Sequence, residues 1–163
     1  MAWLYAHRTP LLDQVMHLLS LSTSAKVLAP LSLVLLVWLW CRKKRWVLFL
    51  LGVGGASTLN LLMKEAFARG RPHFFPALVP ERDYSFPSGH AMGSMALALA
   101  LGLVLTDVSP RLGWVVLSLG VLWSLLVGLS RLYLQVHYPS DVLAGFLVSA
   151  IWVVGLNLWT SKN

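Results

Sequence analysis

Five long apolar stretches, separated by short polar connections, constrain this chain more than any other feature. They cover approximately residues 21–40, 46–67, 88–106, 112–129 and 140–159. A helix that crosses the hydrocarbon core of a bilayer needs about 20 mainly apolar residues, and each stretch has or approaches that length. The sequence therefore predicts an all-α fold, a polytopic membrane helical bundle with about five transmembrane helices.

The composition excludes two other classes of protein. Charged residues make up 12% of the 163 residues, and the mean hydropathy is +0.73. Soluble domains carry about 25% charged residues, so the chain is neither a water-soluble globule nor a disordered segment. The formal net charge of +7 would suit a nucleic-acid partner. However, the basic residues lie between apolar runs, as in the loops of membrane proteins, and we expect no nucleic-acid partner.

Residues 1–20 have a different pattern from the rest of the chain. Thr9 and Pro10 are typical of the N-cap and first residue of a helix. An apolar stripe at helical spacing follows, and Asp13 lies off it. We predict an amino-terminal interfacial helix, within a single membrane-embedded domain over residues 1–163 whose transmembrane bundle covers residues 21–160. The stripe consists of Leu11, Leu12, Val15, Met16 and Leu19.

The connections divide between the two sides of the membrane. The connections 41–45 and 106–111 each join consecutive spans, so both lie on one side. The connections 64–87 and 130–139 must then lie together on the other side. The run Cys41–Arg45 holds four adjacent basic residues, which is typical of a cytoplasmic loop. We therefore expect a multi-pass protein of the cell (inner) membrane whose other face is periplasmic or extracytoplasmic.

Three clusters of polar residues fall on that second face. Ionisable groups at the ends of membrane helices are costly unless they are paired or hydrated, so their gathering indicates a functional site. The clusters are Lys64 with Arg71-Pro72, then Pro87-Ser88-Gly89-His90, then Ser130-Arg131 with His137 and Asp141.

A phosphate group is the ligand that suits this set. Lys64, Arg71 and Arg131 can neutralise a dianion, and guanidinium groups bind phosphate oxygens in pairs. Ser88 and Gly89 lie where a helix begins, and free N–H groups at such a position favour an anion. These five residues are the candidate phosphate-binding residues.

The two histidines and the aspartate provide groups for acid–base and nucleophilic chemistry. His137 and Asp141 are four residues apart, which places them on one helical face if the turn at Pro139 continues into the last helix. A carboxylate that accepts the Nδ1 proton of an imidazole leaves Nε2 free as a nucleophile. His90 is then the acid for the leaving oxygen. The candidate catalytic residues are His137, His90 and Asp141.

Together the clusters resemble the type 2 phosphatidic acid phosphatase superfamily. Its signature is K-x6-R-P, P-S-G-H and S-R-x5-H-x3-D, and all eleven fixed positions match here. The resemblance implies that His137 forms a phosphohistidine, that Asp141 orients it and that His90 protonates the leaving group. It also implies that the lysine, arginines, serine and glycine hold the phosphoryl oxygens. Many membrane members resemble a six-helix core, whereas we expect five spans and an interfacial segment.

The function expected from these residues is that of an integral-membrane lipid phosphatase acting on a phosphomonoester or diphosphate. Two alternatives stay open: a phosphoryl or headgroup transferase using the same site, and a non-catalytic lipid-phosphate binder. The substrate also stays open among phosphatidylglycerophosphate, phosphatidate, undecaprenyl diphosphate and a lipid A phosphate. The oligomeric state is not indicated by the sequence.

We expect no metal, no cofactor and no nucleotide. The chain has neither the ligand spacing of a zinc site nor a G-x4-G-K-[ST] phosphate loop. Other charged residues between the second and third apolar stretches are interpreted as solvated or in contact with lipid headgroups. These are Arg69, Glu81, Arg82 and Asp83.

Overall fold

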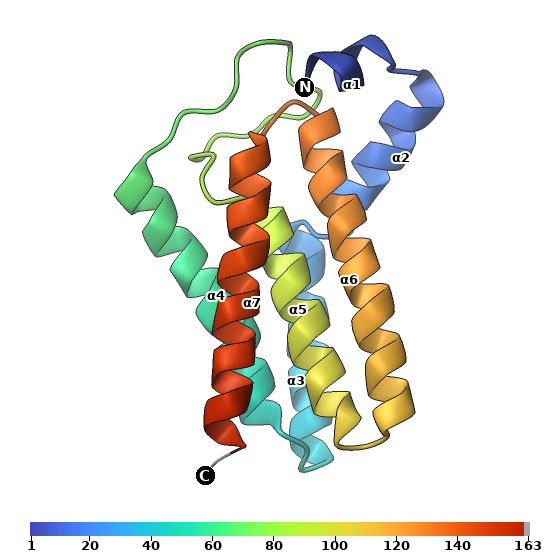
Figure 1. Ribbon diagram of the computed structural model, residues 1–163, viewed down its shortest axis with the longest axis vertical. Helices are drawn as coiled ribbons and strands as arrows, with labels where there is room; N and C mark the ends of the chain where they lie inside the picture. Colours follow the sequence, from blue (N-terminus) through green and yellow to red (C-terminus); the bar gives the residue numbers. More distant parts are fainter. Residues whose placement is uncertain (162–163) are drawn as a thin grey trace.

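The computed structural model describes residues 1–161, and the last two residues of the predicted domain, Lys162 and Asn163, lie outside them. Within this range the regular structure is helical (Figure 1), and the all-α prediction is confirmed. The helices are α1 (Ala2–Ala6), α2 (Pro10–Leu21), α3 (Ala25–Cys41), α4 (Trp46–Phe67), α5 (Gly89–Thr106), α6 (Pro110–Tyr133) and α7 (Pro139–Thr160).

Four of these helices, α4 to α7, are each long and apolar enough to cross a membrane. The helices α2 and α3 are bent by 43° at a short break and together form a fifth candidate span. The first span was expected to begin near Leu21, and this boundary is wrong. Instead α2 ends at Leu21 and α3 begins at Ala25, with Ser24 as its N-cap.

Local chemistry explains where several helices begin and end. Proline is the first residue of α2, α6 and α7, where its missing N–H has no cost. The Thr9 side chain accepts a hydrogen bond from the N–H of Leu12, as predicted for an N-cap. Helix α6 continues four residues beyond its expected end at residue 129. Ser130 and Arg131 therefore lie in its last turn and not in the connection.

Helix α5 lies among α4, α6 and α7 and forms the centre of the bundle (Figure 1). In its most apolar window 67% of the residues are buried, against 22–28% in the other three spans. Small side chains such as Ala96 and Ala100 let the neighbouring helices come close. The outer helices expose leucine, valine and tryptophan side chains, which is the surface that a bilayer covers.

Buried hydroxyl groups also join α5 to its neighbours. The Oγ atoms of Ser94 on α5 and Ser124 on α6 are 2.7 Å apart. The Ser149 hydroxyl of α7 donates to the carbonyl oxygen of Met92 on α5, at 2.8 Å. Each bond satisfies polar atoms that have no water to bind in this environment.

The connections are grouped as the sequence predicts (Figure 1). The α3–α4 and α5–α6 connections lie at one end of the bundle, and the α4–α5 and α6–α7 connections lie at the other. At the first end Arg45 forms an ion pair with Asp107, with 3.2 Å between Nη1 and Oδ2. The same guanidinium donates to Oγ1 of Thr160 at 2.6 Å. Arg45 thus joins the α3–α4 connection to the α5–α6 connection and to the end of α7, in addition to contributing to the basic run.

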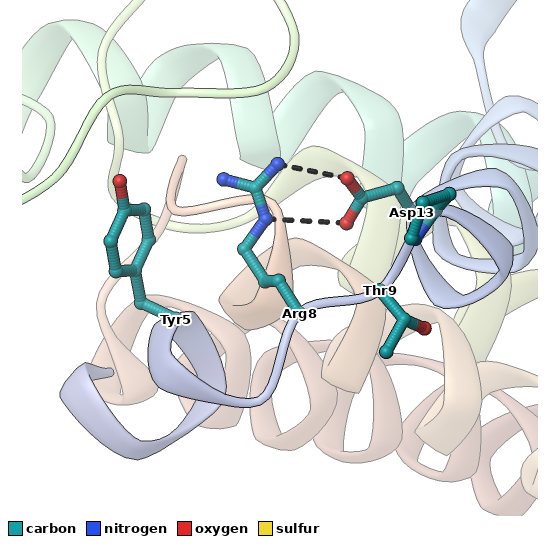
Figure 2. Close-up of a pocket in the computed structure, with 5 residues that line it drawn as sticks. Tyr5, Arg8, Thr9 and Asp13 are labelled. Atoms are coloured by element: carbon teal, nitrogen blue, oxygen red, sulfur yellow. Dashed lines mark hydrogen bonds and ion pairs between the residues drawn. The ribbon is translucent and has the colours of Figure 1, made fainter.

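The amino-terminal helices pack near the end of α6 where the α6–α7 connection begins. Arg8 forms an ion pair with Asp13 (2.9 Å, Figure 2), and the Tyr133 hydroxyl donates to the same carboxylate at 2.7 Å. Leu11 and Val15 of the predicted stripe point outward and are exposed. The interfacial position of this segment stays a prediction.

Helices α5 and α7 approach most closely where α5 begins. A Cβ atom placed on Gly145 of α7 would lie 3.0 Å from the carbonyl oxygen of Ser88 and 3.2 Å from the N atom of Met92. Gly155 of the same helix has no such neighbour within 4 Å. A glycine is therefore required at 145 and not at 155.

We predict that Gly145→Val lowers the free energy of unfolding in detergent by about 1–3 kcal/mol, because the added methyl groups overlap the backbone of α5. Thermal unfolding followed by circular dichroism measures the effect. Gly155→Val is the matched control, since it makes the same replacement in the same helix where space is open. Equal losses of Tm in the two variants would contradict this prediction.

Candidate active site

The three polar clusters meet in one cavity of 1120 Å³ at the end of the bundle that holds the α4–α5 and α6–α7 connections. Six of the eight candidate residues line it: Lys64, Arg71, Gly89, His90, Arg131 and His137. The other two, Ser88 and Asp141, are fully buried and lie behind the wall. Segments that are far apart in sequence therefore assemble one polar pocket.

The cavity extends from these polar residues along an apolar wall. Its lining continues over the α2–α3 break and along the facing surfaces of α3 and α4. Apolar residues of this part include Leu28, Leu33, Leu36, Leu50 and Val53. The same cavity thus has a cationic end and an apolar end.

The three cations of the pocket pair with two carboxylates of the α4–α5 connection. Lys64 lies 2.9 Å from Oδ2 of Asp83, and Arg71 donates to the other oxygen of that carboxylate. Arg131, with 1% of its side chain exposed, donates to Glu81 and to the hydroxyl of Ser20. Carboxylates of one connection thus neutralise all three cations of the pocket.

The ionisation of Asp83 follows from these contacts. Partial burial acts to raise the pKa of Asp83, but the hydrogen bonds and charges of Lys64 and Arg71 outweigh burial and lower the pKa below its ordinary value. Asp83 is therefore charged at neutral pH. A phosphate that enters the pocket must displace it or share its cations.

His137 lies in the short connection before α7, so the pair with Asp141 does not share a helical face as the spacing suggested. Its Nε2 is 3.3 Å from Nη1 of Arg71, and its Nδ1 is 3.5 Å from Oδ2 of Asp141 without a hydrogen bond. A guanidinium can only donate, so Nε2 must carry the lone pair in this contact. The Nδ1 proton then faces Asp141.

The protonation state of His137 agrees with this arrangement. Burial and the charges of Arg131 and Arg71 together outweigh the opposing effect of Asp141 and lower the pKa of His137 to about 4. The imidazole is therefore neutral at pH 7. A neutral imidazole with a free Nε2 is the nucleophilic form.

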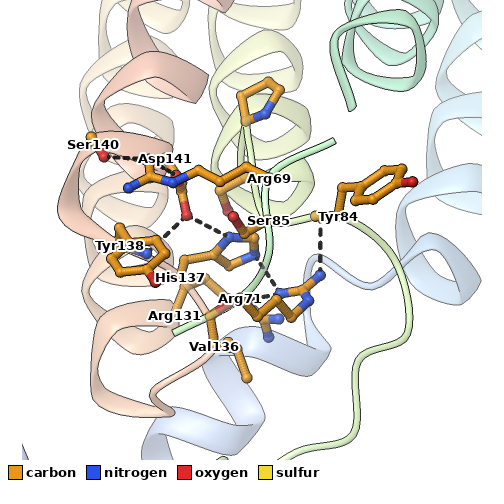
Figure 3. A network of polar contacts seen from close by, with 12 residues as sticks. Arg69, Arg71, Tyr84, Ser85, Arg131, Val136, His137, Tyr138, Ser140 and Asp141 are labelled. Carbon is orange, nitrogen blue, oxygen red and sulfur yellow. Dashed lines mark hydrogen bonds and ion pairs between the residues drawn. The ribbon is translucent and has the colours of Figure 1, made fainter. Parts of the chain in front are cut away.

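Asp141 is held from several directions at the start of α7 (Figure 3). Its Oδ2 accepts the N–H of Tyr138 at 2.8 Å, and its Oδ1 accepts a hydrogen bond from Arg69 at 2.8 Å. Its carbonyl oxygen accepts the N–H of Ser88 at 3.0 Å. Asp141 is 0% exposed, and among the residues that line the cavity its carboxylate faces His137.

The start of α5 brings a helix N-terminus to the pocket. The Ser88 hydroxyl accepts from the N–H of Ala91 at 3.5 Å as an N-cap. The Ser88 N–H, which we expected to face an anion, donates instead to the carbonyl oxygen of Asp141. The N–H groups of Gly89 and His90 are the first of the helix and have no partner within it. A Cβ on Gly89 would lie 3.1 Å from Oδ1 of Asn60, so only glycine fits without displacing that amide.

Four residues of the site were missed by the sequence analysis. Arg69, Glu81 and Asp83 were interpreted as solvated or headgroup-contacting charges. Each also forms an ion pair with a residue of the site, although 56% of the Asp83 side chain is exposed. Asn60 is buried, lines the cavity and donates to the carbonyl oxygen of Pro87 at 3.2 Å. Its position four residues before Lys64, in an apolar helix, was a signal that it shares the face of that lysine.

Within residues 1–161 no group of three or more His, Cys, Asp or Glu side chains is arranged to hold a metal ion.

Residues 45–163 match the PAP2 superfamily. The chain belongs to the PAP2 superfamily.

Relatives and solved structures agree with this assignment. The chain is 37% identical to phosphatidylglycerophosphatase B of Bacillus subtilis (strain 168), over 85% of this chain and 70% of that protein. It is 29% identical to undecaprenyl-diphosphatase BcrC of the same strain, over 90% and 74%. The crystal structure of a transmembrane PAP2-type phosphatidylglycerolphosphate phosphatase from Bacillus subtilis aligns with a TM-score of 0.89 at 31% identity, over 99% of this chain and 82% of that chain.

A second solved structure has the same arrangement. The crystal structure of Aquifex aeolicus LpxE aligns with a TM-score of 0.71 at 26% identity, over 94% of this chain and 90% of that chain. The membrane helices and the named phosphatases among the relatives make this PAP2 protein a multi-span membrane lipid phosphatase. A non-catalytic role, one of the alternatives from the sequence, is thereby set aside.

We predict that Asp83→Asn lowers the inhibition constant of inorganic phosphate by roughly twofold to fivefold, the range of a partly exposed ion pair. The reason is that Lys64 and Arg71 lose the carboxylate that competes with phosphate. Product inhibition of lipid hydrolysis in detergent measures the constant. Glu65→Gln is the control, because it removes an exposed charge next to Lys64. An unchanged or higher constant for Asp83→Asn would contradict the prediction.

Proposed function

We propose that the protein hydrolyses a phosphomonoester or diphosphate of a membrane lipid through a phosphohistidine at His137. The observation that carries this proposal is the single cavity in which a cationic, histidine-containing end adjoins an apolar wall. A phosphorylated lipid has the same two parts. Its headgroup can meet Lys64, Arg71 and Arg131 while its hydrocarbon chain stays against α3 and α4.

In the proposed complex the phosphoryl oxygens take the places of the Glu81 and Asp83 carboxylates. The three cations then neutralise the dianion, and the N–H groups at the start of α5, at Gly89 and His90, face another oxygen. Arg71 transfers its hydrogen bond from Nε2 of His137 to the phosphate. When the substrate phosphate binds, the lone pair of Nε2 is therefore no longer held by Arg71 and can attack phosphorus.

The first chemical step breaks the bond between phosphorus and the lipid oxygen. The lone pair of His137 Nε2 forms a bond to phosphorus, and the leaving oxygen takes a proton from His90. Asp141 stabilises the positive charge that develops on the imidazole through its Nδ1 proton. The lipid leaves with its hydroxyl or with its remaining phosphate.

The second step returns the enzyme to its starting state. Water gives a proton to His90 and its oxygen attacks phosphorus, while the bond from phosphorus to Nε2 breaks. Inorganic phosphate leaves, and His137 is again neutral. Fixed cations replace a divalent ion in this scheme, so we expect turnover to continue in EDTA.

The lipid belongs to the phosphatidylglycerophosphate, phosphatidate or undecaprenyl diphosphate type. The names of two relatives, phosphatidylglycerophosphatase B and undecaprenyl-diphosphatase BcrC, support the first and the last of these. Phosphate release from each lipid in mixed micelles, compared as kcat/KM, tests the proposal and ranks the substrates. Absence of phosphate release from all of them, or transfer of the group to an alcohol acceptor in preference to water, would overturn it.

We predict that His137→Ala removes turnover while the purified protein keeps its elution position in size-exclusion chromatography. A substrate labelled with ³²P, quenched in alkali during turnover, should leave label on the native protein and none on the variant. His73→Ala, a replacement of an exposed histidine in the α4–α5 connection, should keep both activity and label. Substantial turnover by His137→Ala would indicate direct attack by water.

The site is proposed to face the periplasm or the cell exterior. The basic run from Cys41 to Arg45 supports a cytoplasmic position for the opposite end of the bundle. Of the basic residues near the site, Lys64, Arg69, Arg71 and Arg131 are paired with carboxylates. Because their charges are already neutralised, these residues should influence the orientation of the protein in the membrane less than an exposed basic loop does.

We predict that a cysteine at Ala77, an exposed position of the α4–α5 connection, reacts with a membrane-impermeant thiol reagent in intact cells or spheroplasts. The native, exposed Cys41 should react only after permeabilisation, because it lies at the other end. Mass shifts on a gel report both reactions, with Ala77→Cys placed in a Cys41→Ser background. The reverse pattern would put the site in the cytoplasmic leaflet.

A further inference from the structure

Arg69 contacts the start of α7 without lining the cavity. Its Nη1 donates to Oδ1 of Asp141 and to Oγ of Ser140, both at 2.8 Å (Figure 3). Its guanidinium also lies over the Tyr138 ring, 4.1 Å from the ring centroid. One side chain thus contacts three residues of the turn that follows the nucleophile.

The backbone of Arg69 is fixed by the segment that leads into α5. The N–H of Ser85 donates to the carbonyl oxygen of Arg69 at 2.9 Å, and the Ser85 hydroxyl donates to that of Gly70 at 3.0 Å. Ser85 is completely buried. At the end of α4, Ala68 has a left-handed conformation with φ of 43°, which turns the chain into this position. Arg69 therefore reaches Asp141 from a rigid base.

Asp141 needs such a partner because its carboxylate is fully buried. A buried charge is costly unless it is paired and hydrogen-bonded. Its Oδ2 faces Tyr138 N–H and His137, which leaves Oδ1 for a second partner. Within residues 1–161, Arg69 is the one lysine or arginine that forms an ion pair with Asp141.

We propose that Arg69 is a positioning residue for the lipid phosphatase reaction: it holds the Asp141 carboxylate in place, with Oδ2 directed at Nδ1 of His137. This inference rests on the proposed roles of His137 and Asp141. Arg69 touches neither the cavity nor the phosphoryl group, so its effect falls on the chemical step and leaves substrate binding unchanged. The residue lies outside the fixed positions of the signature, between Lys64 and Arg71.

The charge of Arg69 also has a predictable effect on the pH dependence. Removing a positive charge from the far side of Asp141 leaves more of the carboxylate's field for His137, which favours the imidazolium. The acid limb of kcat/KM then moves to higher pH. Other charged or titratable groups also surround His137, and they are unchanged in an Arg69 variant. From the helices these are Asp141, Arg131 and His90. From the α4–α5 connection they are Arg71, Glu81 and Asp83, and Lys64 of α4 pairs with Asp83.

The test compares Arg69→Gln, Arg69→Lys and Arg82→Gln in the full-length protein with a lipid phosphate in mixed micelles. Arg69→Gln is expected to lower kcat by roughly 10- to 100-fold, the cost of a misplaced catalytic group, with KM within about twofold. Its acid limb moves to higher pH. Arg69→Lys restores part of kcat and returns the acid limb, because it restores the charge. Arg82→Gln, an exposed arginine of the same connection, matches the native protein.

Several outcomes would overturn the proposal. They are an Arg69→Gln variant with native kcat, one whose loss lies in KM, and one whose acid limb stays in place or moves to lower pH. If Arg69→Gln does not purify as a folded protein, Arg69→Lys decides through the same split between kcat and KM. His137→Ala in the same assay distinguishes failure of the proposed phosphohistidine mechanism from failure of the proposed role of Arg69. An active His137→Ala removes the proposed mechanism, whereas an inactive one beside a native-like Arg69→Gln removes only the role of Arg69.

Discussion

Neutralising charge at the edge of a bilayer is the constraint on which the whole site depends. Buried or half-buried ions are stable there only when each has a counter-ion and hydrogen bonds. The protein meets this condition with an interlocked set in which no basic member lacks a carboxylate and no carboxylate lacks a base. The set comprises Lys64, Arg69, Arg71 and Arg131 with Glu81, Asp83 and Asp141. A phosphate dianion can enter because it offers the same cations an equivalent partner.

The helices supply the geometry for this chemistry through small residues and backbone contacts. Helix α5 is buried on most of its surface, and its first turn lies against α7 at Gly145. The N–H of Ser88 donates to the backbone of Asp141, which joins the start of α5 to the turn that follows His137. The apolar part of the cavity follows from the bend between α2 and α3, where the two helices line one wall.

Much of this arrangement could be predicted from the sequence, and the failures have a physical reason. The bounds of α4 agree with the apolar stretch 46–67. The motif residues that line the cavity were found because the residues of each motif lie within a short segment of the sequence. Arg69 was missed because its partner Asp141 is 72 residues away, and only the folded chain brings them together. The Ser88 N–H was expected to face an anion because the sequence does not show that it donates to the carbonyl oxygen of Asp141, 53 residues further along the chain. The break before Ala25 was missed although the polar residues Ser22, Thr23 and Ser24 interrupt the apolar stretch there and Ser24 is the N-cap of α3.

The spacing of the ion pairs along the chain has a consequence for biosynthesis. Lys64 and Arg71 find their counter-ions within the next 20 residues, at Glu81 and Asp83. A nascent chain that has inserted α4 therefore already carries the carboxylates that these cations need, before α5 enters the membrane. Arg131 arrives later and meets Glu81 in place, whereas Asp141 arrives with the last helix. The pocket gains the proposed nucleophile, His137, and the Asp141 carboxylate together and at the end, and until then Arg69 is without its carboxylate partner. We therefore expect partly inserted chains to be inert toward lipid phosphates.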